Sequence, residues 1–206
     1  MGELRRKGHL IIISGPSGVG KGTVCSKLIE MSPDLRLSIS ATTREKRKGE
    51  VDGKNYFFKS VEEFKDLIAG HKLIEFAKVH GNFYGTPKEF VDKNIEQGHD
   101  VILEIDVQGA KQVKEFMDEG VFIFLLPPRL KDLEDRLRSR GTENDDQIEL
   151  RLKNGREEIM QLNDFHYAVI NDNVQACAQR IMHIIDAENQ RIDSQLIKFY
   201  KEEYND

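Results

Sequence analysis

A run of aliphatic residues leads directly into a glycine-rich segment that ends in lysine. The run His9–Ser14 (HLIIIS) shows no polar alternation, which predicts a strand buried on both faces of a sheet. The segment Gly15–Lys21 (GPSGVGK) follows at once, and a helical pattern starts at Lys21. The spacing fits G-x-x-x-x-G-K in the strand–loop–helix order that this motif requires. This order restricts the chain to folds in which a buried strand feeds a helix through such a loop.

Strand-like and helical patterns alternate along the rest of the chain. Alternation of this kind favours an α/β fold, with a parallel sheet wrapped by helices. With 206 residues, the chain is expected to form one domain with inserted subdomains. Further buried strands are predicted at Val101–Ile105, Val121–Leu126 and Tyr167–Ile170. Helices are predicted near Lys21–Met31, Pro87–Gln97, Gln108–Glu119 and Leu130–Arg140, and from Val174 onward.

Two segments interrupt this alternation. The first, Leu37–Thr86, is rich in Thr, Arg, Gly and aromatic residues, and it contains a helix start with capping-box spacing at Ser60–Glu63. The second, Arg129–Gln161, is densely charged and follows two prolines. We interpret the first as an inserted subdomain and the second as a mobile helical flap. A second capping box is predicted at Thr86–Glu89, with Pro87 at the first helical position.

Charge and cysteine content exclude several classes of protein. The 31 basic and 36 acidic residues give a net charge of −5, so the chain is not suited to cover nucleic acid, and an anionic ligand would need a local basic pocket. Two cysteines, Cys25 and Cys177, cannot form a disulfide framework or a four-sulfur zinc site. No stretch approaches the ~20 apolar residues that span a bilayer. We therefore expect a soluble, cytoplasmic protein without nucleic-acid or membrane partners.

The glycine-rich loop has the chemistry of a phosphate site. Its glycines let backbone N–H groups face inward, and the helix N-terminus behind them adds partial positive charge. Lys21 would then reach the β- and γ-phosphates of a nucleotide as a point charge. The alternative is an ordinary glycine-rich turn between a strand and a helix. The residues expected at the phosphates are Gly15, Pro16, Ser17, Gly18, Val19, Gly20, Lys21, Gly22 and Thr23.

One position departs from the strict form of this motif. The residue after Lys21 is Gly22, and the hydroxyl comes one residue later, at Thr23. Thr23 would point about 100° away along the new helix, so it is better placed to hydrogen-bond a phosphate than to bind a metal. The run Gly-Lys-Gly-Thr also occurs in nucleoside monophosphate kinases. We therefore expect Mg²⁺ to be held by water and phosphates without a direct protein ligand, with Asp106 acting through the water shell.

A second cluster of anion-binding side chains lies in the inserted segment. Arg44 and Arg47 stand three residues apart among hydroxyl-bearing residues, and Tyr56 and Tyr84 follow. Arginine forks and tyrosine hydroxyls are suited to hold a second phosphate opposite the first loop. The alternative is a solvated charged loop.

The same stretch resembles the guanylate kinase signature S-x-T-T-R-x-P-R-x-G-E-x-x-G-x-x-Y. The resemblance covers nearly the whole chain and implies a P-loop nucleoside monophosphate kinase fold, with a five-stranded parallel core sheet and helices on both faces. It also implies the reaction ATP + GMP → ADP + GDP, with Mg²⁺. The signature positions are Ser40, Thr42, Thr43, Arg44, Arg47, Gly49, Glu50, Gly53 and Tyr56, with Lys46 in place of the usual proline.

The resemblance also implies a division of the single domain 1–206 and a set of site residues. The core would comprise residues 1–38, 90–130 and 157–206, the GMP-binding subdomain residues 39–89, and the lid residues 131–156. The glycine-rich loop would bind ATP, and Asp106 would face the Mg²⁺ shell or the acceptor nucleotide. The residues implied for the GMP phosphate are Arg44, Arg47, Tyr56 and Tyr84, and those implied for guanine or its surroundings are Ser40, Glu75 and Thr86.

Two carboxylates also have a rationale of their own. Guanine presents N1–H and N2–H₂ as adjacent donors, which the carboxylate of Glu75 could accept together, whereas adenine offers no such pair. The alternative for Glu75 is an exposed strand carboxylate. Asp106 is expected to end a buried strand, at the edge where open sheets bind ligands, and for this reason we prefer it to Glu104 on the same face.

Three arginines of the charged flap complete the expected site. Arg136 and Arg140 are four residues apart and so share one helix face, and Arg151 follows in the next helical pattern. The resemblance implies that they fold over the ATP phosphates and form the catalytic set together with Lys21 and Asp106. The alternative is a helix laced with salt bridges.

Two other functions stay open. Guanylate-kinase-like domains of scaffold proteins bind peptides without catalysis, although those typically lack an intact phosphate loop and sit within longer chains. A kinase for another nucleoside monophosphate is the second, although Glu75 argues against AMP. ATP as co-substrate and GMP are the expected small-molecule partners, and homo-oligomer formation stays open.

Overall fold

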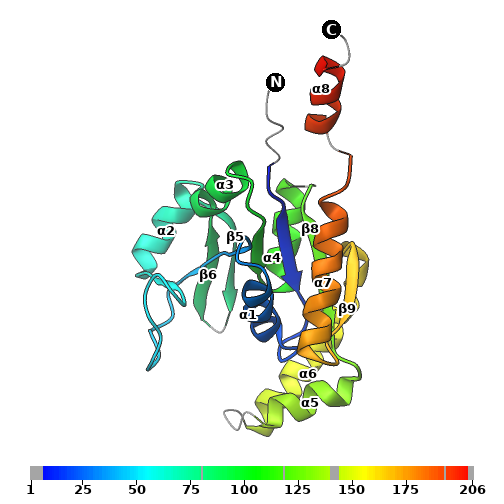
Figure 1. Ribbon diagram of the computed structural model, residues 1–206. Coiled ribbons are helices and arrows are strands. Elements are labelled where there is room, and N and C mark those ends of the chain that lie inside the picture. The colour runs from blue at the N-terminus through cyan, green and yellow to red at the C-terminus, as the bar shows by residue number, and fades with distance from the viewer. Residues whose placement is uncertain (1–6, 80, 118, 140–143, 193, 204–206) are drawn as a thin grey trace.

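The core of the protein is a five-stranded parallel sheet. The computed structural model describes residues 7–79, 81–117, 119–139, 144–192 and 194–203. Parallel pairing throughout confirms the expected α/β fold (Figure 1). The sequence pattern missed β2, because an edge strand of two residues carries no periodic signal. The strand order is β2 (Arg36–Leu37), β7 (Val101–Glu104), β1 (Leu10–Ser14), β8 (Val121–Leu126) and β9 (Tyr167–Ile170).

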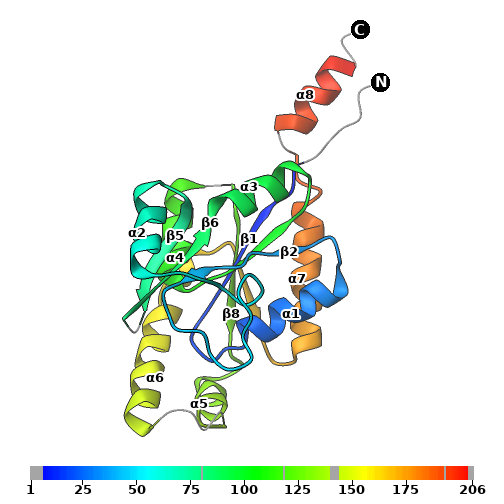
Figure 2. The ribbon, with the colours of Figure 1, turned by 90° about the vertical axis from the view of Figure 1, so that its left-hand side faces the viewer.

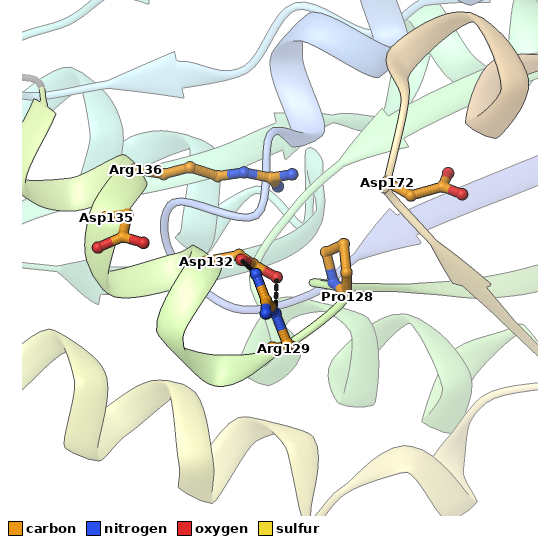
Figure 3. Close-up of a pocket in the computed structure, with 6 residues that line it drawn as sticks. All are labelled: Pro128, Arg129, Asp132, Asp135, Arg136 and Asp172. Atoms are coloured by element: carbon orange, nitrogen blue, oxygen red, sulfur yellow. Dashed lines mark hydrogen bonds and ion pairs between the residues drawn. The ribbon is translucent and has the colours of Figure 1, made fainter.

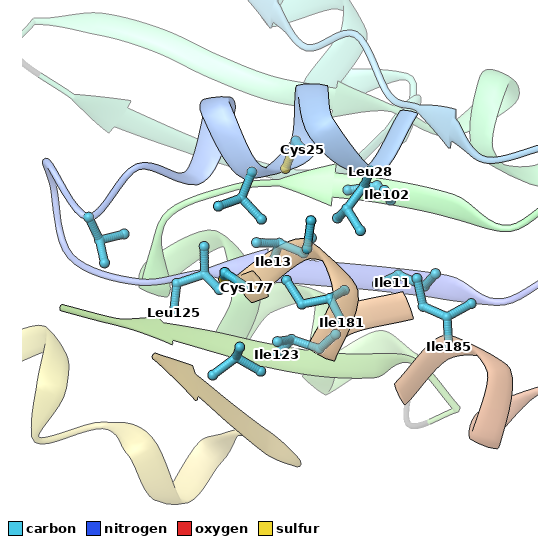
Figure 4. Packing of buried hydrophobic residues seen from close by; sticks show 14 of the residues in the cluster. Ile11, Ile13, Cys25, Leu28, Ile102, Ile123, Leu125, Cys177, Ile181 and Ile185 are labelled. Atoms are coloured by element: carbon cyan, nitrogen blue, oxygen red, sulfur yellow. The ribbon is translucent and has the colours of Figure 1, made fainter. Parts of the chain in front are cut away.

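Apolar clusters on both faces of this sheet hold the helices against it. Every residue of β1 is buried, as its unbroken apolar run predicts. Ile11 and Ile13 belong to the cluster on one face (Figure 4), and Ile12 belongs to the cluster on the other. The phosphate loop therefore leaves from a strand that is fixed on both sides. The helices are α1 (Lys21–Met31) and α7 (Val174–Glu188) on the first face, and α3 (Lys88–Glu96) and α4 (Val107–Phe116) on the second.

A second, four-stranded sheet lies between β2 and α3 in the chain. The predicted capping box at its helix is confirmed, because Ser60 Oγ accepts from Glu63 N at 3.1 Å and Ser60 N donates to Glu63 Oε2 at 2.7 Å. Phe64 of the same helix is buried and stacks on Phe83, with ring centroids 5.4 Å apart. The elements are β4 (Phe57–Phe58), β3 (Ala41–Thr42), β6 (Asn82–Pro87) and β5 (Leu73–Val79), in sheet order, and α2 (Val61–Ala69).

The capping box predicted at the start of α3 is wrong. Pro87 is the N-cap residue, and no side chain hydrogen-bonds to the cap. Thr86 belongs to β6 and is buried, and its Oγ1 donates to Glu75 Oε1 at 2.7 Å instead. A buried hydroxyl takes the partner that its strand presents, and here that partner is a carboxylate on the neighbouring strand.

The charged flap forms two helices, α5 (Leu130–Ser139) and α6 (Asp145–Ile159), at one end of the molecule (Figure 1). Their apolar residues Leu133, Leu137 and Ile148 join the main core cluster, which packs the two helices against the core. The last helix, α8 (Ser194–Glu203), lies at the opposite end (Figure 2). Among the described residues, no helix is both long enough and apolar enough to cross a membrane.

Candidate nucleotide-binding site

The glycine-rich loop turns sharply between β1 and α1. Gly15, Gly18 and Gly20 have φ angles of 144°, 88° and 100°, a range that side chains with a Cβ rarely adopt. The loop also passes close to β8, because a Cβ at Gly15 would lie 2.5 Å from the Leu125 carbonyl oxygen. Gly20 is the N-cap of α1, so the first N–H groups of that helix face the loop. Backbone donors of this kind are what a phosphate site needs.

The Lys21 side chain folds back onto the start of the loop. Its Nζ donates to the Gly15 carbonyl oxygen at 2.5 Å. Burial lowers the pKa of Lys21, while the nearby carboxylates of Glu104, Glu158 and Asp106 act to raise it. The lysine therefore provides a positive charge at the loop, which surrounding acidic groups partly balance.

Glu104 lies directly over the start of α1. A Cβ at Gly22 would lie 3.4 Å from both carboxylate oxygens of Glu104. The Glu104 residue is exposed, yet desolvation of its carboxylate by the surrounding protein raises the pKa of Glu104. The positive charge of Lys21 acts in the opposite direction and lowers that pKa. Glu104 also interacts electrostatically with Tyr56 of the inserted sheet. Glu104 thus interacts both with the start of α1 at the glycine-rich loop and with Tyr56 of the inserted segment.

Asp106 has a different position from the one expected. The strand β7 ends at Glu104, and Asp106 is the N-cap of α4, where its Oδ1 accepts from Gly109 N at 2.7 Å. It still interacts electrostatically with Lys21 and with Glu75. The preference for Asp106 over Glu104 rested on its place at the strand end, and that place belongs to Glu104.

Glu75 is a buried carboxylate, not an exposed strand residue. Its side chain is only 5% exposed, and Oε1 accepts from Thr86 Oγ1 at 2.7 Å. Burial raises the pKa of Glu75 to about 7, with a further upward contribution from Asp106 and a downward one from Thr86. A Cβ at Gly109 would lie 2.8 Å from Oε2, so α4 approaches the carboxylate from the other side. Such a group can accept a pair of adjacent donors from a ligand.

The arginine–tyrosine cluster is partly assembled. Arg44 Nη2 donates to Glu50 Oε1 at 2.7 Å, and this bond raises the pKa of Arg44. The Arg44 guanidinium lies 5.4 Å from the Tyr56 ring centroid, and the Tyr56 and Tyr84 rings lie 6.0 Å apart. Arg44 is half-buried in this group, whereas the Arg47 side chain is exposed. The solvated-loop alternative therefore describes Arg47 but not Arg44.

Ser40, the remaining residue implied for the guanine surroundings, lies between β2 and β3. Its side chain is half-buried, and its carbonyl oxygen accepts from Phe57 N at 2.9 Å. Ser40 thus joins the start of the inserted sheet to β4, on the same sheet that carries Glu75.

Two of the three flap arginines contact the phosphate loop. Arg136 Nη1 donates to the Val19 carbonyl oxygen at 3.0 Å, and Arg136 Nη2 donates to the Asn171 carbonyl oxygen at 2.8 Å. Arg151 Nη1 donates to Ser17 Oγ at 3.4 Å, a long contact. Arg140 lies outside the described residues. The salt-bridge alternative holds for Arg138 of the same helix, which pairs with acidic neighbours.

Asn171 was missed by sequence reasoning. It follows β9, is only 3% exposed, and its Nδ2 donates to the Val19 carbonyl oxygen at 2.8 Å. Arg136 and Asn171 therefore hold the same loop carbonyl from two elements. A single asparagine after a short strand has no sequence signal that distinguishes it from an ordinary turn residue.

A pocket of about 530 Å³ lies beside Arg136. Figure 3 shows Arg136 and Asp132 coming from α5, and Asp172 from the segment after β9. Arg129 Nη2 pairs with Asp132 Oδ1 at 2.7 Å across its edge. Arg136 lines this pocket and also contacts the phosphate loop through the Val19 carbonyl oxygen. The lining residues are Pro128, Arg129, Asp132, Asp135, Arg136 and Asp172.

Comparison with known proteins gives one consistent family. The guanylate kinase family model matches residues 7–188. The chain is 56% identical to the guanylate kinase of Caldanaerobacter subterraneus subsp. tengcongensis over 93% of each chain, and 48% identical to that of Lactococcus lactis subsp. lactis over 92% of this chain and 93% of the other. It also resembles the crystal structure of guanylate kinase from Anaplasma phagocytophilum, with a TM-score of 0.75 and 35% identity, over 91% of this chain and 89% of that one. With its parallel sheet, its phosphate loop and these matches, the chain belongs to the guanylate kinase family.

Proposed function

We propose that this protein transfers the γ-phosphoryl group of ATP to GMP, giving ADP and GDP. The observation that carries the proposal is the buried Glu75 carboxylate, held by Thr86 on the inserted sheet and electrostatically linked through Asp106 to Lys21 of the phosphate loop. A carboxylate that reads a base and a loop that binds a triphosphate are thereby parts of one site. Phosphoryl transfer requires little more than two phosphates in line, charge neutralisation and exclusion of water.

The donor site is built on α1 and the flap. We assign the ATP phosphates to the loop Gly15–Thr23, with Lys21 as the point charge at the transferred group. Arg136 and Arg151 would act from the flap side, where both already contact the loop. Arg140 keeps its predicted role on the same flap. The adenine ring would occupy the pocket beside Arg136, because Arg136 lines that pocket and also contacts the loop.

The acceptor site is built on the inserted sheet. The GMP phosphate would be held by Arg44, Arg47, Tyr56 and Tyr84. Glu75 would accept from N1–H and N2–H₂ of guanine, and Thr86 would keep the carboxylate in place through its hydrogen bond. Ser40 directly precedes β3 of the same sheet and would face the base.

Mg²⁺ fits this site as an ion coordinated mainly by water and phosphates. Mg²⁺ retains several waters and uses one or two carboxylates, and the carboxylates that act on Lys21 include Glu104 and Asp106. These two residues would hold its water shell, while Gly22 offers no hydroxyl. When bound, the ion would supply counter-charge to the donor phosphates.

The remaining contribution of the protein residues is to position the two substrates and to exclude water. A GMP phosphate oxygen is already a competent nucleophile, so we assign no general base. The inserted subdomain 39–89 and the lid 131–156 would close over the core 1–38, 90–130 and 157–206 to exclude water. The two buried free thiols of Cys25 and Cys177 suit the cytoplasm, which we propose as the location.

A coupled assay of ADP production tests the proposed function. ATP is supplied with GMP, AMP, CMP or UMP as acceptor, and GMP is expected to give by far the highest kcat/KM. Lys21→Met should abolish turnover while leaving the protein folded, because the point charge at the transferred phosphate is lost. Equal use of all four acceptors would show another kinase activity. Absence of turnover with every acceptor would favour the peptide-binding class.

A further inference from the structure

A glutamine on α4, Gln112, forms hydrogen bonds with both the backbone N–H and the backbone carbonyl of one residue of β5. Gln112 Oε1 accepts from Phe76 N at 3.1 Å, and Gln112 Nε2 donates to the Phe76 carbonyl oxygen at 2.8 Å. The helix α4 belongs to the core and β5 to the inserted sheet, so this amide pair joins the two parts of the molecule. Gln112 thus replaces the strand partner that Phe76 lacks on that edge, because β5 is the last strand of its sheet.

This pairing between Gln112 and Phe76 lies next to Glu75, the residue proposed to face the base. Phe76 directly follows Glu75, and side chains alternate along a strand, so Phe76 is 39% exposed while Glu75 is 5% exposed. The pairing of β5 with β6 shifts register between Leu73 and Phe76, so the ladder is irregular at Glu75 itself. The regular hydrogen bonds that would fix a strand residue are therefore interrupted at this position, and the Gln112 amide restores a fixed point one residue away.

The same face of α4 also limits where the Glu75 carboxylate can lie. Gly109 is one turn before Gln112, and a Cβ there would lie 2.8 Å from Glu75 Oε2. Asp106 Oδ1 holds the Gly109 N–H at 2.7 Å, which fixes this turn of the helix. The helix α4 thus sets the backbone of β5 through Gln112 and leaves room for the carboxylate through Gly109.

We propose that Gln112 is a positioning residue for base selection: its two-way amide pairing with Phe76 holds Glu75 where its carboxylate meets both guanine donors. The inference rests on the proposed function, because the base-reading role of Glu75 is part of that proposal. Gln112 itself touches no substrate. Its effect is on the choice between purine monophosphates, and GMP and IMP are the diagnostic pair because IMP lacks the 2-amino group.

The test compares kcat/KM for GMP and for IMP in Gln112→Met. Methionine keeps the length and helix propensity of glutamine but removes both hydrogen bonds. We expect the GMP-over-IMP ratio to fall about tenfold through a higher GMP KM, because a displaced acceptor leaves the 2-amino group unpaired. The KM for ATP should be unchanged. Gln112→Glu keeps the acceptor for Phe76 N and loses the donor, so its ratio should be intermediate. The control is Gln108→Met, an exposed glutamine of the same helix.

A second variant covers the case in which Gln112→Met does not fold. Gly109→Ala places a methyl group against Glu75 Oε2 and so displaces the carboxylate, and it should lower the same ratio. A wild-type GMP-over-IMP ratio in a folded Gln112→Met, or in Gln112→Glu and Gly109→Ala, would overturn the inference while wild-type turnover of GMP leaves the proposed function intact. A wild-type protein that does not phosphorylate GMP would overturn both.

Discussion

The Glu104 carboxylate occupies the space beside Gly22, with both oxygens 3.4 Å from where a Cβ at that position would be. A serine or threonine there would direct its hydroxyl into the carboxylate. Because Gly22 has no side chain, it leaves the space after Lys21 in which the Glu104 carboxylate lies. An acidic group on β7 takes the place that a hydroxyl on α1 holds in the strict form of the motif.

Glu104→Gln should lower kcat by about tenfold or more, because the variant loses a negative charge beside Lys21 and at the proposed Mg²⁺ shell. The KM for GMP should change little. The measurement is steady-state kinetics over a range of Mg²⁺ concentrations, where Glu104→Gln should need more Mg²⁺ for half-maximal rate. Thr23→Ala, at an exposed position on α1, should cost less. A larger loss in Thr23→Ala than in Glu104→Gln would contradict this account of the loop.

The pH dependence of GMP use should report Glu75. The pKa of its carboxyl is about 7, and only the ionised form accepts both guanine donors, so kcat/KM for GMP should fall about tenfold per unit as the pH drops well below 7. GMP also titrates in this range, and the profile of Glu75→Gln provides the control because it contains the titrations of the substrate and of the other protein groups but not that of Glu75. Identical profiles for the two proteins would remove Glu75 from base recognition.

The raised pKa of Glu75 also makes the stability of the folded protein depend on pH, and stability should fall with rising pH where kcat/KM for GMP rises. The folded state binds the Glu75 proton more tightly than the unfolded state, whose ordinary value is 4.5. The contribution to stability is therefore complete below about pH 4.5 and is lost as the pH rises toward 7. Glu75→Gln, which is neutral throughout, should raise the Tm of the unliganded protein more at pH 8 than at pH 5. Thermal unfolding at the two pH values measures this difference, and an equal change at both would contradict the linkage.

Arg136→Ala should raise the KM for ATP by about tenfold, because the Val19 carbonyl then depends on Asn171 alone and the loop loses one of its two anchors. Arg136→Lys can donate to one carbonyl and should recover part of the loss. Arg138→Ala is the matched control, since Arg138 is exposed on the same helix and pairs only weakly with Glu134 and Asp145. Equal KM values for the Arg136 and Arg138 variants would show that the loop does not need the anchor.

Arg44→Ala should raise the KM for GMP and lower kcat together, because Arg44 is fixed by Glu50 and stands against Tyr56. Arg47→Ala should act in the same direction with a smaller effect on stability, since its side chain is exposed. Kinetics with GMP as the varied substrate, together with thermal unfolding, separates the two. A normal kcat/KM in Arg44→Ala would restore the solvated-loop interpretation.

Local sequence determined the elements that carry strong periodic or turn signals. The apolar run before Gly15 specifies a buried strand because its aliphatic side chains point to both faces of the sheet and must be covered on both, and the Ser60–Glu63 spacing specifies a helix start because its bonds are made within four residues. The family resemblance supplied the five-stranded core, the reaction and the site residues. Neither the local sequence pattern nor the family resemblance located the edge strand Arg36–Leu37, because its pairing partner is distant in the chain.

Tertiary structure alone decided which groups meet. Thr86 has the spacing of a helix cap, yet it faces Glu75 because the partners of a buried hydroxyl are set by the neighbouring strand. Glu104 and Asp106 look alike in sequence, and their roles separate only because β7 stops at Glu104 and α4 begins after Asp106. Asn171 lies 152 residues from the loop carbonyl that it holds. Such contacts depend on the packing of separate elements, which local propensity does not encode, and so they became visible only in the folded chain.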